Sequence, residues 1–142
     1  MPPHTHDEGI TDDKYLLRAL SRGWVITDAG RERPSTEAFT DSSHENSCFV
    51  EGEISIAEIH QFLADQSDQF AGEASFARIP VAIIRAVGFI VERRPHEAGG
   101  CANPNAHVVV GPALPLGRKQ YQNTARTIVK DLRVTIIRHT FG

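Results

Sequence analysis

Three polar residues have side chains that could bind and transform an anionic substrate. Arg33 could hold a phosphate or carboxylate through its planar guanidinium, and His107, which titrates near neutrality, could act as general acid or base. Ser35 could donate to a phosphate or act as a nucleophile, although no Gly-x-Ser-x-Gly elbow surrounds it. In the structural alternative, Ser35 caps a turn, His107 is hydrogen-bonded inside the protein, and Arg33 pairs with a neighbouring glutamate at the surface.

Two histidine–cysteine pairs form a candidate zinc site. His44 precedes Cys48 by four residues, and His96 precedes Cys101 by five. Zinc takes four nitrogen or sulfur ligands, so two such pairs from two loops would suffice. Neither pair has the tight Cys-x-x-Cys spacing, and the alternative is a buried Cys48, acting as a small apolar residue, with solvated histidines.

A basic stripe is predicted on a helix spanning residues 118–132. Its cations fall within roughly 120° of the helix circumference. They are Arg118, Lys119, Arg126, Lys130 and Arg133, with Arg138 beyond. Such a stripe over residues 118–133 could bind the phosphates of a nucleic acid, although no aromatic residue lies on this face to stack bases. The alternative is a solvated face, or one that pairs with acidic residues elsewhere.

The charge is divided unevenly along the chain. The 142 residues carry a net charge of −3. Residues 1–75 hold 15 acidic and five basic residues, a net charge of −10, whereas residues 76–142 hold three acidic and ten basic residues, a net charge of +7. Such asymmetry favours either a charged binding surface or two halves that fold against each other.

Composition excludes several protein classes. With 40% hydrophobic and 23% charged residues, the chain fits a folded globular protein, and its two cysteines exclude a disulfide-rich scaffold. Its longest apolar run, residues 79–91, is interrupted by Pro80, Arg85 and Gly88 and is too short to span a membrane. The first residues have neither the basic nor the apolar region of a signal peptide, so we expect a cytoplasmic protein without a membrane partner.

Local patterns predict one domain over residues 12–142, preceded by a flexible tail over residues 1–11. Residues 12–23 are expected to form a short helix. Residues 30–48 and 94–105 are expected to be loops, because they are rich in polar, Gly and Pro residues. Strands are expected at residues 24–26, 48–50, 77–79, 89–91, 107–110 and 134–141.

Two further helices have clearer signals. Ser55 and Glu58 form a capping box that predicts a helix through Asp65. The helix over 118–132 should turn one apolar stripe to the core. This stripe comprises Tyr121, Ala125, Ile128, Val129 and Leu132. Residues 80–88 fit either a short helix ended by Gly88 or a buried strand.

These elements predict an α+β fold, with a small, mostly antiparallel sheet and about three helices packed on one side. No nucleotide-binding glycine motif and no His-Glu-x-x-His motif is present. We therefore expect no cofactor.

Two segments resemble signatures found together in small uncharacterised bacterial proteins. Residues 33–39 resemble an Arg-Pro-Ser-x-x-Phe signature, and residues 103–111 resemble Asn-Pro-x-His-x-x-Val-x-Gly, with Asn105 as one additional residue. The resemblance spans roughly residues 14–132 and implies a bacterial single-domain protein, without indicating a chemistry.

Three functions fit these observations. The first is an interaction module that binds a protein partner, as the charge division and the missing catalytic motifs suggest. The second is a small enzyme for a phosphate-bearing substrate, such as a nucleotide or RNA, that uses Arg33 and His107. The third is a structural domain stabilised by zinc.

Overall fold

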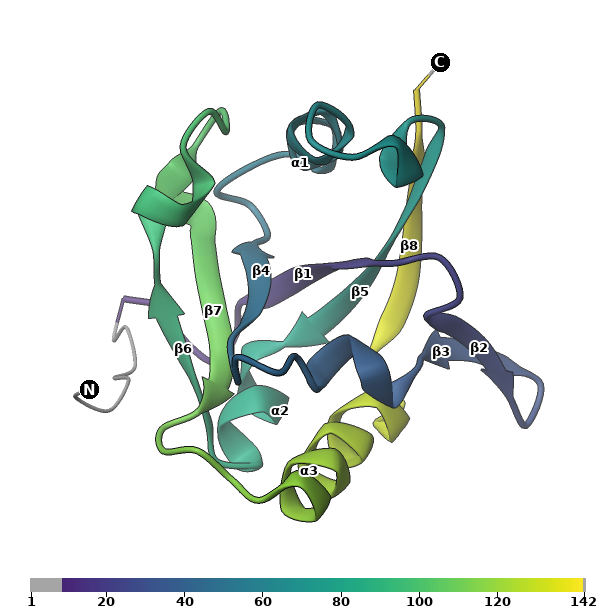
Figure 1. The fold of residues 1–142 in the computed structure, drawn as a ribbon, viewed down its shortest axis with the longest axis vertical. Helices are drawn as coiled ribbons and strands as arrows, with labels where there is room; N and C mark the ends of the chain where they lie inside the picture. Colours follow the sequence, from purple (N-terminus) through teal and green to yellow (C-terminus); the bar gives the residue numbers. More distant parts are fainter. Residues whose placement is uncertain (1–8, 142) are drawn as a thin grey trace.

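A six-stranded antiparallel sheet organises the fold in the computed structural model, which describes residues 9–141 (Figure 1). Its strand order is β6-β7-β4-β1-β5-β8, and each neighbouring pair is antiparallel. The strands are β1 (Tyr15–Leu20), β4 (Asn46–Val50), β5 (Glu73–Pro80), β6 (Phe89–Arg93), β7 (His107–Pro112) and β8 (Thr135–Thr140). A separate hairpin, β2 (Val25–Asp28) and β3 (Arg31–Pro34), packs beside β8.

Helices cover both faces of this sheet. α2 (Val81–Ala86) and α3 (Arg118–Lys130) pack on one face, in the α2/α3 core with Leu16 and Ile79. α1 (Ile56–Ala64) packs on the other face, in the α1 core with Leu17 and Phe76. The α+β class is confirmed, but the helices are not on one side, because the central strands carry large apolar residues on both faces.

The first strand differs from the sequence prediction. Residues 12–23 were expected to form a helix, but Tyr15–Leu20 form β1 in the middle of the sheet. Leu16 and Leu17 are 0% and 2% exposed and point into opposite cores. A strand buried on both faces is a continuous apolar run, which lacks the alternation that distinguishes a strand from a helix.

The N-terminal prediction falls mostly outside the described residues, which exclude 1–8. Ile10 lay inside the expected tail, yet it is 1% exposed and belongs to the α2/α3 core. The packed domain therefore includes residues before position 12.

Local signals fix two helices. The capping box of α1 is confirmed, because the Ser55 hydroxyl accepts from the Glu58 amide at 3.1 Å and the Ser55 amide donates to the Glu58 carboxylate at 3.2 Å. The segment after Pro80 is the helix α2 rather than a strand, and Gly88, with φ +87°, follows it. A positive φ favours glycine, which explains why the helix stops there.

α3 is shorter than expected, and this changes the environment of one residue. The helix ends at Lys130, and Asp131 is extended. Leu132 was expected in the core stripe but is 78% exposed. Helical spacing no longer applies after Lys130, so Leu132 projects to solvent while Val134 returns to the core.

The expected loops contain short helical turns. Residues 30–48 include β3 and the 3₁₀ turn η1 (Thr36–Phe39), in which Ala38 and Phe39 are fully buried. Residues 94–105 include η3 (Pro95–Ala98) and the start of η4 (Pro104–Ala106). Among the helices of residues 9–141, none has the length and apolar character needed to cross a bilayer.

A substitution at Gly111 in β7 tests how closely this strand packs against the segment before β4. An added Cβ would overlap the backbone carbonyl oxygen of His44. We expect Gly111→Ala to lower the free energy of unfolding by about 2–3 kcal/mol, because backbone on both sides must shift. Chemical denaturation measures this loss.

Gly99→Ala is the matched control, because a Cβ there meets nothing within 4 Å. It should be neutral or stabilising by up to about 1 kcal/mol. Equal stability of the two variants would contradict the described packing.

Candidate functional site

His107 is held by two hydrogen bonds that define its protonation. It begins β7, is 4% exposed, and has Nδ1 2.8 Å from the Arg94 carbonyl oxygen. A carbonyl only accepts, so Nδ1 carries the proton and Nε2 of the neutral ring is free to accept. Nε2 lies 3.2 Å from the Ser47 hydroxyl, which therefore donates to it.

The surroundings favour the neutral ring. Burial lowers the pKa of His107 below its ordinary value, and the charges of Arg94 and His96 lower it further. The hydrogen bond to the Arg94 carbonyl and the negative charge of Glu97 oppose this effect. Because the net shift is downward, His107 is neutral at pH 7 and can accept a proton.

Ser47, which contacts His107, is a candidate site residue that the sequence analysis missed. Ser47 lies in β4 opposite Val109 of β7. Phe49, two residues further along β4, lies opposite His107. The side chain of Ser47 is exposed, whereas Cys48 is buried on the other face. The predicted strand began at Cys48, one residue too late to include it. Strand alternation extended by one residue would have placed Ser47 on the face of Phe49.

The structure does not bring Arg33 to His107. Arg33 is 9% exposed in the β2–β3 hairpin, where its guanidinium donates to Asp28 and to the Pro34 carbonyl, both at 2.9 Å. The hairpin packs beside β8, and β7 lies four strand positions from β8. At about 4.8 Å per strand, β7 and β8 are roughly 19 Å apart along the sheet, so the hairpin beside β8 is remote from His107.

Ser35 neither caps a turn with its side chain nor joins His107 in a site. It precedes η1 but makes no side-chain capping bond. Its hydroxyl oxygen is buried, and no hydrogen-bond partner is found for it within residues 9–141. The predicted combination of Arg33, Ser35 and His107 is therefore not assembled.

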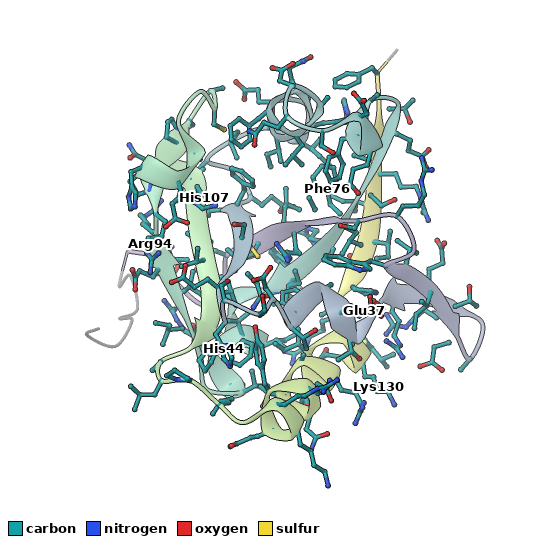
Figure 2. The ribbon with its side chains drawn as sticks, viewed as in Figure 1. Glu37, His44, Phe76, Arg94, His107 and Lys130 are labelled. Atoms are coloured by element: carbon teal, nitrogen blue, oxygen red, sulfur yellow. The ribbon has the colours of Figure 1, made fainter. Side chains whose placement is uncertain are left out.

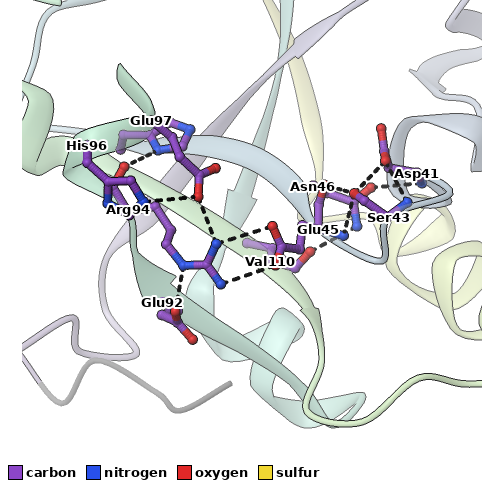
Figure 3. Close-up of polar contacts among 10 residues, drawn as sticks. Asp41, Ser43, Glu45, Asn46, Glu92, Arg94, His96, Glu97 and Val110 are labelled. Carbon is purple, nitrogen blue, oxygen red and sulfur yellow. Dashed lines mark hydrogen bonds and ion pairs between the residues drawn. The ribbon is translucent and has the colours of Figure 1, made fainter. Parts of the chain in front are cut away.

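Arg94 joins the two expected loops through three carboxylates (Figure 3). Its guanidinium lies 2.6 Å from Glu92, 2.8 Å from Glu97 and 3.1 Å from Glu45. Burial alone would lower the pKa of Arg94, but hydrogen bonds to these glutamates raise it above its ordinary value. Figure 2 shows Arg94 and His107 on the same side of the molecule, away from Lys130 of α3.

A second polar network holds the segment before β4 against α3. The fully buried Asn46 donates to the Val110 carbonyl at 2.9 Å and to the Tyr121 hydroxyl at 3.0 Å. Tyr121 donates in turn to the Asp41 carbonyl at 3.1 Å. His44 stacks on the Tyr121 ring with centroids 4.3 Å apart. These contacts hold in place the segment that leads to Ser47.

The candidate zinc ligands are dispersed. Cys48 lies in the α2/α3 core and Cys101 in the α1 core, on opposite faces of the sheet. His96 is 77% exposed, and burial raises the pKa of Cys48 to about 12, so the metal-binding thiolate is disfavoured. Across residues 9–141, no group of three potential ligands converges. The predicted set has no common centre.

Many of the opposite charges of the two halves form ion pairs with each other inside the fold. Five arginines of the second half pair with carboxylates of the first half at 2.7–3.1 Å. The pairs are Arg78–Glu51, Arg85–Asp12, Arg93–Glu53, Arg94–Glu45 and Arg138–Glu32. These pairs neutralise the sheet and its connections.

The basic face of α3 is not neutralised in this way. Arg118, Lys119, Arg126 and Lys130 are exposed, and within the described chain none of them forms an ion pair with a carboxylate. Arg126 donates only to the Asn123 amide oxygen, at 3.1 Å. Arg133, at the end of the stripe, pairs with the adjacent Asp131.

A buried histidine pair, also missed from the sequence, joins α1 to β8. His60 is 0% exposed and donates from Nε2 to the Phe70 carbonyl at 2.7 Å. Its Nδ1 is therefore an acceptor, and it lies 2.7 Å from Nδ1 of His139. Phe141 stacks on the His60 ring with centroids 4.0 Å apart.

Comparison with known proteins gives no match: no family model, no curated protein and no solved structure is similar to this chain.

The Arg94 cluster can be tested by removing its cation. We expect Arg94→Gln to lower the free energy of unfolding by about 2–4 kcal/mol at pH 7, because three neighbouring carboxylates lose their counter-charge. Urea denaturation measures the loss. It should shrink at high salt, which screens the repulsion between the carboxylates.

Arg126→Gln is the control, since this exposed arginine pairs with no carboxylate in residues 9–141. Its effect should stay within about 0.5 kcal/mol. A loss in Arg94→Gln that is the same at low and at high salt would contradict the electrostatic explanation.

Proposed function

We propose that this protein is an interaction module that binds an acidic protein partner through the outer face of α3. The supporting observation is that, within residues 9–141, the exposed α3 cations form no ion pair with a carboxylate, although arginines elsewhere in the second half do. Arg118, Arg126 and Lys130 are separated by eight and four residues along one side of the helix. A partner whose carboxylates are spaced like these three cations would form an ion pair with each of them.

Apolar groups at both ends of α3 support a protein partner. Leu132 follows the helix and is 78% exposed, and Leu114 precedes it and is 63% exposed. Exposed apolar side chains and arginines suit a protein interface, whose buried core is more apolar than the rest of the surface and in which Arg is enriched. Such leucines contribute little to a phosphate backbone contact.

One feature disfavours a nucleic acid as the partner. The aromatic residue of α3, Tyr121, is 4% exposed, so the basic face offers no surface on which bases could stack. Nucleic-acid binding through residues 118–133 is therefore the competing outcome of the test below.

A bacterial cytoplasmic location belongs to the same proposal. Cys48 and Cys101 are both free thiols, as is usual in a reducing compartment. The resemblance of residues 33–39 and 103–111 to bacterial signatures supports the source.

The proposal predicts the effect of reversing charge on α3. The triple change Arg118→Glu, Arg126→Glu and Lys130→Glu should weaken binding of a labelled Glu-Glu-Leu repeat peptide by about 10–100-fold, because each exposed ion pair contributes up to about 1 kcal/mol. Leu132→Ser should weaken it by a further factor of about 5–10. Fluorescence anisotropy at two salt concentrations measures both effects.

Arg22→Glu is the matched control, because Arg22 is exposed, forms no carboxylate pair in the described chain and lies before β2. It should leave peptide affinity unchanged. Tighter binding of single-stranded RNA or duplex DNA of equal charge would favour a nucleic-acid-binding module instead. An equal loss of peptide affinity in Arg22→Glu would show that the peptide is bound by nonspecific charge attraction rather than by α3.

A further inference from the structure

We propose that Ser47 and His107 form a nucleophile–base pair that accepts an acyl group from a neutral or cationic carboxylic ester. This activity is separate from the binding function of α3. It uses a serine that the sequence pattern did not indicate, and it does not require Arg33.

The contacts have the order that an activated serine needs. The Ser47 hydroxyl donates to Nε2 of His107 at 3.2 Å, and Nδ1 of the same ring donates to the Arg94 carbonyl at 2.8 Å. The carbonyl fixes the ring orientation and the tautomer, as a third group does for the base of other serine nucleophiles. The ring edge is also confined by Phe49, whose centroid lies 5.3 Å away.

The serine is accessible while its base is sheltered. Ser47 is exposed, so an ester can reach its hydroxyl, whereas His107 is 4% exposed. The backbone of Ser47 is held as well, because its carbonyl accepts from Nη1 of Arg18 at 2.8 Å. An accessible nucleophile on a rigid strand beside a buried neutral base is a suitable arrangement for acyl transfer.

The proposed step balances without a cofactor. Oγ of Ser47 forms a bond to the ester carbonyl carbon while its proton moves to Nε2 of His107. The bond from that carbon to the leaving oxygen then breaks, and His107 returns the proton to the leaving alcohol. Water repeats the sequence on the acyl-serine, with His107 again as the base, and releases the carboxylic acid.

The surrounding charge indicates the substrate class. Glu45, Glu92 and Glu97 gather around one cation, Arg94, whose donors are directed to these carboxylates. Among these four residues the carboxylates outnumber the cation, so the cluster that adjoins His107 is net negative. It should repel a phosphate ester or an acyl group with a carboxylate, and attract an acyl group with a quaternary ammonium.

The test is acylation of the purified full chain by 4-nitrophenyl acetate, followed by nitrophenolate release and mass mapping of the acetylated residue. We expect acetylation at Ser47, and a rate of nitrophenolate release about 100-fold lower in Ser47→Ala and in His107→Asn, the range of one general base. A 4-nitrophenyl ester with a trimethylammonium acyl group should react faster than one with a carboxylate.

Ser43→Ala is the matched control. Ser43 is exposed in the same segment, but its hydroxyl lies 2.6 Å from Asp41 and contacts no histidine. This variant should react like the wild type. Because Ser47 is exposed, Ser47→Ala should fold, and its result stands even where His107→Asn is unstable.

The pH profile separates a base from a structural histidine. The groups that face His107 are Ser47 and Phe49 of β4, and Arg94, His96 and Glu97 around η3. Because its pKa lies below the ordinary 6.5, the acylation rate should fall to half of its plateau value at a pH below 6.5. Wild-type acetylation no faster at Ser47 than at Ser43, or a rate unchanged in Ser47→Ala, would overturn the proposal.

Discussion

The central strand β1 must be covered on both faces, and most of the architecture follows from this requirement. Leu16 and Leu17 point into different cores, so α2 and α3 are needed on one face and α1 on the other. Burying two such side chains contributes roughly 3–6 kcal/mol. β1 also pairs with β4 only at Leu16 and Leu17, and beyond that point the two strands separate.

Arg18 occupies the place where this separation begins. It is 9% exposed, and it donates from Nε to the Ala38 carbonyl at 2.9 Å and from Nη1 to the Ser47 carbonyl. The guanidinium thus replaces the missing strand contacts and satisfies carbonyls that would otherwise be buried without a donor. The position of Ser47 beside His107 therefore depends on an arginine in the middle of the sheet.

The use of arginine also explains the uneven charge of the sequence. Arginines of the later strands and their connections reach carboxylates of the earlier segments, as Arg78 does to Glu51 and Arg93 to Glu53. Each pair joins residues far apart in the chain. The opposite net charges of the two halves therefore reflect these pairs, whereas the exposed cations of α3 form no ion pair with a carboxylate in residues 9–141.

The sequence predicted the elements whose signals are local. The capping box of α1 and the apolar stripe of α3 lie within single helices, so neighbouring residues decide them. β1 was assigned to a helix because its burial is imposed by helices far along the chain. Leu132 was placed in the core because its spacing was helical, but the helix had ended at Lys130.

The candidate site was only half predictable for a similar reason. His107 was identified by its residue type and its position at the start of a strand. Its relation to Ser47 depends on the pairing of β4 with β7, which joins residues 60 positions apart. The separation of Arg33 from His107 depends on strand order, which no spacing in the sequence encodes.

The contact between His60 and His139 has a consequence for the order of events during synthesis. The two residues are 79 positions apart. At ordinary elongation rates, roughly 4–16 s pass between their appearance. During that interval α1 lacks His139 and Phe141, whose rings contact His60, so this end of the helix is open to solvent. The contact between α1 and β8 therefore forms late, after β1, β4 and β5 have been made.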